Sequence, residues 1–187
     1  AWRPFLFGLF LLLWLPAARA ALEIQVVGGA DSKIPLALVE FQRAPGQPAP
    51  SLTEIVAADL ARTGQFQLLP TAGGPQPHAP AEVDFAHWRG RGADALVIGQ
   101  VLPLPGGRFD VRFRLFDAPR RTQLAAFGYT IAAEQWRATA HQIANVIYEK
   151  LTGAKGAFHT RIAYVQKQGR RFELRLADAD GHNPRVV

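Results

Sequence analysis

The chain has 187 residues, of which 49% are hydrophobic and 19% charged, so one ordinary domain can bury a core and a disordered chain is excluded. The formal net charge is +6, but the basic residues are scattered from Lys33 to Arg185, which disfavours a nucleic-acid module with its charge on one face. Cysteine is absent, so neither a disulfide nor a thiol nucleophile is available.

Residues 1–20 have the layout of a secretory signal. Arg3 precedes an apolar run over residues 5–15, and small side chains at Ala18 and Ala20 suit a signal peptidase, so we expect cleavage after Ala20. The alternative is an uncleaved membrane anchor, but the run is shorter than the roughly 20 residues that span a bilayer. Because methionine is absent even at position 1, we also expect the sequence to be a fragment.

The segment after the signal is a short strand candidate on a flexible joint. Leu22, Ile24 and Val26 alternate with polar residues, and the run breaks at Gly28-Gly29. This strand can pair within its own domain or with another protein.

Residues 34–157 predict an α/β domain with a mixed sheet and two main helices. A capping box over residues 51–54 starts the first helix, which Gly64 ends, and the apolar stripe of residues 134–151 marks the second. A short helical turn is expected around residues 85–89, and residues 108–116 alternate as a strand with one solvated face. The expected strands are residues 34–41, 65–69, 95–102, 108–116 and 123–131.

Residues 161–184 predict a β-hairpin that turns at Gly169. Phe172, Leu174 and Leu176 lie on one face of its second strand. A two-stranded hairpin is marginally stable alone, so we expect its partner strands to lie outside this sequence.

No catalytic or metal-binding motif stands out. The five histidines lack HExxH spacing, neither of the two serines (Ser32 and Ser51) lies in a GxSxG elbow, and we expect no cofactor and no metal. His141 lies beside the apolar stripe and is interpreted as a rim residue. Asp178 and Asp180 favour a tight turn over a calcium loop.

Four segments resemble the TolB family of the Tol-Pal system in Gram-negative bacteria. They are "AADLARTGQF" (57–66), "GADALVIGQV" (92–101), "EKLTGAKGAFHTRIAYV" (149–165) and "ELRLADADGHN" (173–183). The resemblance implies an α/β domain followed by a six-bladed β-propeller, of which only the first two strands would be present. The expected divisions are a signal peptide (1–20), a flexible partner-binding segment (21–33), the α/β domain (34–157) and a partial first blade (158–187).

The resemblance also implies a non-enzymatic periplasmic adaptor, monomeric, that links TolA and Pal. Such proteins support outer-membrane integrity and constriction at cell division, and bacteriocins use the system during import. Pal would bind the missing propeller, and TolA would bind residues 21–33 by strand addition. The expected partner-binding residues are Leu22, Glu23, Ile24, Gln25, Val26 and Val27. An exported hydrolase of unknown substrate is the alternative function.

Overall fold

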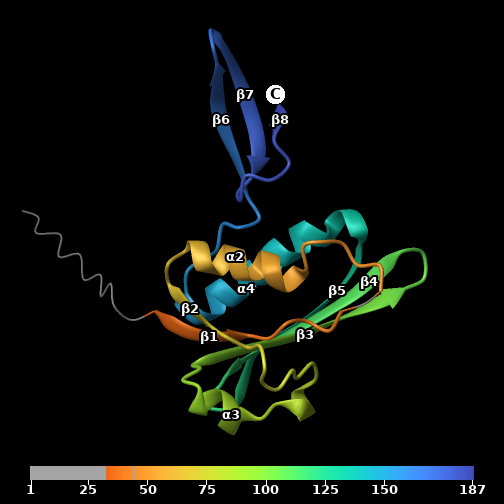
Figure 1. The fold of residues 1–187 in the computed structure, drawn as a ribbon, viewed down its shortest axis with the longest axis vertical. Coiled ribbons are helices and arrows are strands. Elements are labelled where there is room, and N and C mark those ends of the chain that lie inside the picture. The colour runs from red at the N-terminus through yellow and green to blue at the C-terminus, as the bar shows by residue number, and fades with distance from the viewer. Residues whose placement is uncertain (1–32, 44) are drawn as a thin grey trace, which may run out of the picture. The chain divides into compact units, whose positions relative to one another are not determined.

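A computed structural model describes residues 33–43 and 45–187. Five strands form a mixed sheet in the order β2-β1-β3-β4-β5 (Figure 1). β1 pairs in parallel with β2 and β3, whereas β3, β4 and β5 form an antiparallel meander. The strands are β1 (Ile34–Leu38), β2 (Phe66–Leu69), β3 (Ala95–Leu104), β4 (Arg108–Asp117) and β5 (Thr122–Ala132). The α/β class and the mixed sheet are confirmed.

Two helices, α2 (Leu52–Arg62) and α4 (Trp136–Thr152), cover one face of the sheet (Figure 1). The predicted capping box starts α2: the Glu54 N–H donates to Ser51 Oγ at 3.2 Å, and the Ser51 N–H donates to Glu54 Oε2 at 2.6 Å. α4 begins two residues later than expected because a 3-10 turn occupies Ala133–Gln135. Apolar side chains of both helices and of the sheet form the larger core.

A short helix, α3 (Phe85–Gly90), covers part of the opposite face (Figure 1). Trp88 is fully buried there, and Phe116 of β4 packs edge-on against Phe85, with ring centroids 5.5 Å apart. The prediction that this face of β4 is solvated is therefore wrong at its end, although Arg112 remains exposed.

β1 is shorter than predicted because the chain leaves the ladder after Leu38 and touches it again at Gln42, which bridges to Gln100. Phe41 is buried in this detour and lies over Gly99, where the strand has no side chain to obstruct the ring.

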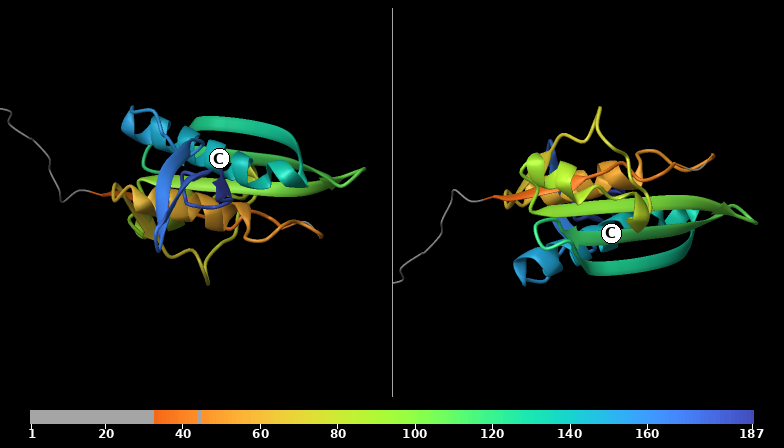
Figure 2. Two further views of the ribbon diagram at one scale, coloured as in Figure 1. Left: turned by 90° about the horizontal axis from the view of Figure 1, so that it is seen from above. Right: turned by 90° about the horizontal axis from the view of Figure 1, so that it is seen from below.

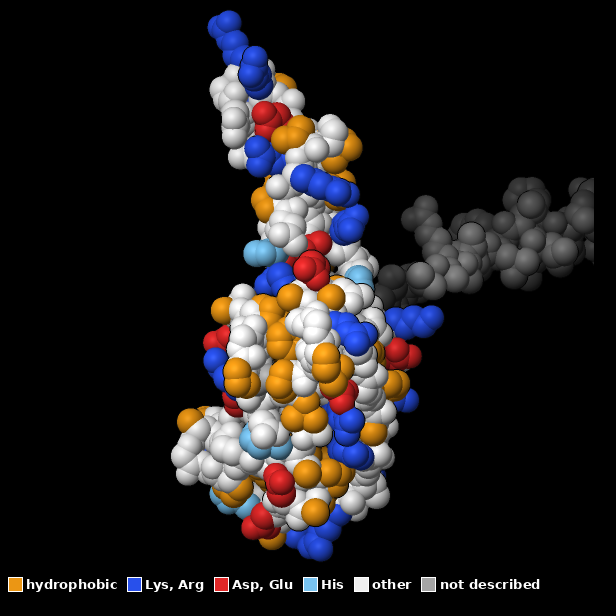
Figure 3. Space-filling view, turned by 90° about the vertical axis from the view of Figure 1, so that its right-hand side faces the viewer, with side chains coloured by type: hydrophobic (Ala, Val, Ile, Leu, Met, Phe, Trp, Pro, Cys, Tyr) orange, Lys and Arg blue, Asp and Glu red, His pale blue; other side chains and the backbone are white. Residues whose placement is uncertain are grey.

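The predicted hairpin is present with one additional strand. β6 (Arg161–Gln168) pairs antiparallel with β7 (Arg171–Asp178), and β8 (Arg185–Val186) joins the outer side of β7. Hydrophobic and basic side chains both reach the surface of this part of the molecule (Figure 3). Its exposed large hydrophobic residues are Ile162, Val165, Phe172, Leu174, Val186 and Val187. Within the described residues, no helix is long and apolar enough to cross a membrane.

Candidate functional site

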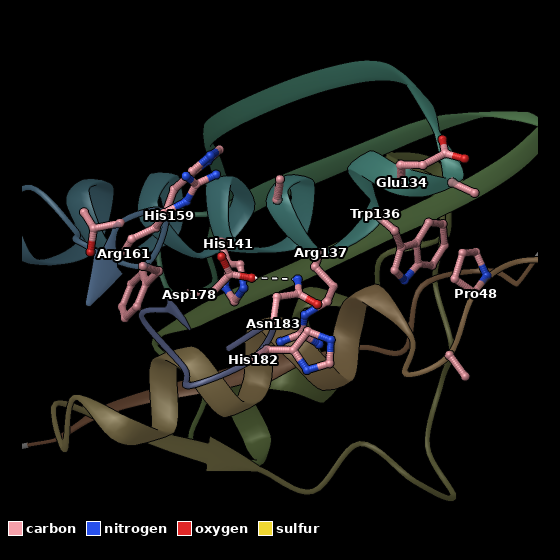
Figure 4. Close-up of a pocket in the computed structure, with 15 residues that line it drawn as sticks. Pro48, Glu134, Trp136, Arg137, His141, His159, Arg161, Asp178, His182 and Asn183 are labelled. Atoms are coloured by element: carbon pink, nitrogen blue, oxygen red, sulfur yellow. Dashed lines mark hydrogen bonds between the residues drawn. The ribbon is translucent and has the colours of Figure 1, made fainter. Parts of the chain in front are cut away.

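A cavity of about 460 Å³ lies between the first turns of α4, the segment that enters β6 and the turn that follows β7 (Figure 4). Its wall combines basic, acidic and aromatic side chains. The principal lining residues are Glu134, Trp136, Arg137, His141, Phe158, His159, Arg161, Asp178, His182 and Asn183.

A hydrogen-bonded histidine–aspartate pair buried between α2 and α4 forms the base of this site. His141 is 4% exposed and its Nδ1 lies 2.6 Å from Oδ2 of Asp59, which is 1% exposed. Oδ1 of the same carboxylate is bound by Arg62, whose guanidinium reaches solvent. A paired carboxylate only accepts hydrogen bonds, so the proton on this side of the ring belongs to Nδ1. Asp59 therefore fixes the tautomer and the orientation of His141.

A second carboxylate approaches the other side of the imidazole. Oδ2 of Asp180 lies 3.7 Å from Nε2 of His141, and the same oxygen is bound by the Arg137 guanidinium. Burial alone would raise the pKa of Asp180, but the N–H of His182 and the charges of Arg137, His141 and Arg62 together hold this pKa below its usual value. The carboxylate is thus kept ionised between α4 and the turn after β7.

The turn after β7 is held by its own hydrogen bonds, as the sequence predicted. Asn183 Nδ2 donates to Asp178 Oδ2 at 3.0 Å (Figure 4), and the Gly181 N–H donates to the Asp178 carbonyl at 2.8 Å. Gly181 has a φ of 82°, which glycine adopts without strain. This geometry presents Asp180 to α4.

The chain between α4 and β6 is also fixed to the helix. The Phe158 N–H donates to Asn145 Oδ1 at 3.0 Å, and the Phe158 ring packs edge-on against Tyr148, with centroids 5.7 Å apart. On the far side of the cavity, Trp136 Nε1 donates to the Pro50 carbonyl at 2.9 Å. The cavity wall is therefore anchored at both ends.

The charges in the cluster are balanced, which suits a structural role better than a reactive one. Asp59 and Asp180 are offset by Arg62 and Arg137, while Nε2 of His141 is buried without a hydrogen-bond partner in the described structure. Among residues 33–43 and 45–187, no three or more histidine, aspartate or glutamate side chains are grouped to hold a metal ion. The arrangement can join α2, α4 and the β7 turn through one imidazole.

The interpretation of His141 as a rim residue is wrong, because the ring is buried between two carboxylates. Sequence reasoning also missed Asp59. A signal was available: Asp59 occupies the i+7 position of the stripe that starts at Leu52 and continues through Ile55 and Val56. A charge on the apolar face of a helix indicates a buried partner elsewhere.

The predicted partner-binding residues, Leu22 to Val27, lie outside the described residues, so the structure does not test them. The cleavage site after Ala20 lies outside them as well.

Comparison with known proteins identifies the family. The model of the TolB amino-terminal domain matches residues 22–124. The Tol-Pal system protein TolB of Thiobacillus denitrificans is 63% identical over 171 residues, covering 91% of this chain and 40% of that protein. The Tol-Pal system protein TolB of Nitrosomonas europaea is 48% identical over 188 residues, covering 99% of this chain and 44% of that protein.

A solved structure agrees with these sequence matches. The crystal structure of TolB from Acinetobacter baumannii superposes with a TM-score of 0.72 at 30% identity, covering 83% of this chain and 38% of that one. The chain spans about 40% of the length of the relatives it matches. The fold, the matched segments and these relatives agree that the chain belongs to the TolB family, over its amino-terminal domain.

Proposed function

We propose that this chain is part of a non-enzymatic adaptor of the Tol-Pal envelope complex in the periplasm, which links TolA and Pal. The observation that carries the proposal is the match of the TolB amino-terminal domain to residues 22–124, together with relatives named as Tol-Pal system proteins. The expected signal over residues 1–20 supports export. Amino-terminal sequencing of the exported protein tests this part, and a first residue of Ala21 is expected.

TolA binding is assigned to residues 21–33, which directly precede β1. In this proposal the segment adds as a strand to an edge of a TolA sheet, so that main-chain hydrogen bonds supply affinity. Leu22, Ile24 and Val26 share one face of that strand and would contact TolA, while Glu23 and Gln25 face away.

Pal binding is assigned to a propeller that would follow the hairpin. We propose that β6, β7 and β8 belong to its first blade. Supporting this, the three strands pair in sequence order, as in an antiparallel blade, and their large hydrophobic residues are exposed rather than packed. The roughly 60% of each relative that this chain does not cover leaves room for the remaining blades.

The proposal is tested by titrating the carboxyl-terminal domain of TolA, from the same organism, with two forms of the chain. One form begins at Ala21 and the other at Ile34, where β1 starts, so that the deletion leaves the described sheet intact. We expect binding by the longer form only. Equal binding by both forms, or by neither, contradicts the strand-addition mechanism.

A pair of substitutions distinguishes strand addition, in which one face of the segment contacts TolA, from a hydrophobic contact that has no defined face. Ile24→Lys places a charge on the face toward TolA and should weaken binding by about tenfold or more, because burial of an aliphatic side chain stabilises by about 1.5 kcal/mol or more. The matched control, Gln25→Lys, adds the same charge on the opposite face and should change affinity little. Equal loss in both variants would contradict an extended strand.

A further inference from the structure

The outer edge of the five-stranded sheet lacks most of the usual protection against strand pairing. The exception is a register shift at Leu124, between the pairs Leu115–Ala125 and Phe116–Gln123, and the pairing from Ala125 to Ala132 is regular. β5 is the longest strand of the sheet, with 11 residues, and it lies at the edge (Figure 2). Its sequence, TQLAAFGYTIA, contains no charged residue and no proline. Proteins usually guard an exposed edge with charges, proline or a very short strand, because its free backbone groups accept another strand. The opposite edge follows this rule: β2 has only four residues and is followed by Pro70.

The helix-covered face of β5 carries a row of aromatic rings that continues to the edge. Phe127 stacks on Phe113 of β4, with centroids 5.8 Å apart, and lies 6.4 Å from Tyr129 on its own strand. Phe127 is 44% exposed, so the row ends with an open ring. An apolar side chain on an added strand would cover this ring, as cross-strand pairs do inside a sheet.

The other face of the same edge offers positive charge. Arg112 pairs with Gly128 across the ladder, and Arg114 pairs with Ala126. Gly128 and Ala126 are small, so the aliphatic parts of the two arginine side chains can extend over β5. A Cβ at Gly128 would lie only 3.8 Å from Arg112 Cγ, which shows how closely that side chain covers the strand. A hollow of about 300 Å³ is lined by residues 112–114 and 126–128.

Both arginines make their contacts near the surface, although Asp110, the partner of Arg112, is itself only 18% exposed. Arg112 bridges to Asp110 at 2.7 Å with its own side chain 58% exposed, and Arg114 Nη1 donates to Gln123 Oε1 at 2.9 Å in an exposed hydrogen bond. Exposed pairs of this kind contribute little and exchange readily. Both guanidinium groups can therefore turn to a carboxylate on a neighbouring strand.

We propose that the β5 edge binds an extended segment of a partner protein whose residues alternate between apolar and acidic. The backbone of β5 would supply the hydrogen bonds, the aromatic row would take the apolar side chains, and Arg112 and Arg114 would take the acidic ones. Charge complementarity selects this partner over a second copy of the chain, because β5 has no acidic residue and two copies would bring their arginines together. The proposed surface involves none of residues 21–33 and does not depend on the adaptor role proposed above.

The test uses the chain from Ala21 labelled with ¹⁵N and a capped eight-residue peptide that alternates valine and glutamate. We expect saturable amide shifts concentrated in residues 122–132, and no comparable shifts with a peptide that alternates valine and lysine. Arg112→Gln with Arg114→Gln should weaken binding about tenfold, since two exposed ion pairs are each worth up to about 1 kcal/mol. Arg120→Gln with Arg121→Gln removes the same charge from the β4–β5 turn and should leave affinity unchanged.

Several outcomes overturn the proposal. They are absence of binding by the glutamate peptide, equal binding by the lysine peptide, and amide shifts confined to β2 or to the hairpin. An equal loss of affinity in the Arg112/Arg114 and the Arg120/Arg121 double variants would also overturn it. Concentration-dependent shifts in β5 without any peptide would assign the edge to self-association and would overturn the acidic partner. The amide spectrum of each variant reports whether the fold is retained.

Discussion

Removing the Asp59 carboxylate should destabilise the chain by an amount that its surroundings allow us to estimate. In Asp59→Ala, Nδ1–H of the buried His141 loses its acceptor, and a buried donor without a partner costs about 1–3 kcal/mol. The other partner of Asp59, Arg62, is 45% exposed and can be hydrated, so losing the Arg62–Asp59 ion pair adds little to this cost. We expect a free energy of unfolding lower by about 2–3 kcal/mol, below the 3–5 kcal/mol typical of a fully buried pair.

Asp59→Asn separates charge from hydrogen bonding. The amide oxygen can still accept from His141 Nδ1 at the same position, so the expected loss is about 1 kcal/mol. Urea unfolding followed by far-UV circular dichroism measures both variants, with the exposed Glu134→Gln as a control expected within about 0.5 kcal/mol of the parent. For a chain of this length, the alanine variant should melt about 4–12 °C lower. A loss under about 0.5 kcal/mol for Asp59→Ala would refute a stabilising role for the pair.

Three further predictions concern other parts of the fold. Gly99→Ala should cost about 1–3 kcal/mol, because the new Cβ would lie 2.7 Å from the buried Phe41 ring; a normal urea midpoint would show that the ring can move. Ser51→Ala should cost about 1 kcal/mol through loss of the cap that accepts from Glu54 N–H, and the same assay measures it against Ser51→Asp, which keeps the cap. Asp180 has a lowered pKa in the folded state, so its contribution to stability is present above pH 3.8 and is lost as the pH falls below that value. The urea midpoint of Asp180→Asn should therefore fall less steeply with pH below 3.8 than that of the parent. An equally steep fall would contradict a stabilising role for the Asp180 carboxylate.

The sequence predicted those elements whose formation depends on local periodicity. The capping box at Ser51 and the stripe that includes Ile143 and Ile147 mark α2 and α4 because each helix buries one face, and burial follows the 3.6-residue repeat. The alternation of β4, the Gly106-Gly107 turn before it and Pro119 after it predicted the meander for the same reason. Boundaries shifted where tertiary contacts intervened, as at Phe41, whose burial over Gly99 interrupts β1.

The charged cluster could not be assembled from local pattern. Asp59 and His141 are 82 positions apart in the chain, and Arg137 meets Asp180 across 43 positions, so only the packing of α2 against α4 and of the β7 turn against α4 brings them together. The helical periodicity of the sequence could show that Asp59 lies on an apolar stripe, but not which residue would contact it. Asp180 was correctly placed in a turn, yet the direction of its side chain depends on the hydrogen bonds of that turn.

The cluster joins two segments that lie far apart in the sequence. Residues 57–66 contribute Asp59 and residues 173–183 contribute Asp180, and the two carboxylates face opposite nitrogens of His141. Hydrophobic contact alone would allow the β7 turn to slide along α4, because apolar attraction has little direction. An ion pair with Arg137 beside a fixed imidazole favours one position of the turn and leaves charges unpaired in the others. The cluster therefore sets where the hairpin begins relative to α4.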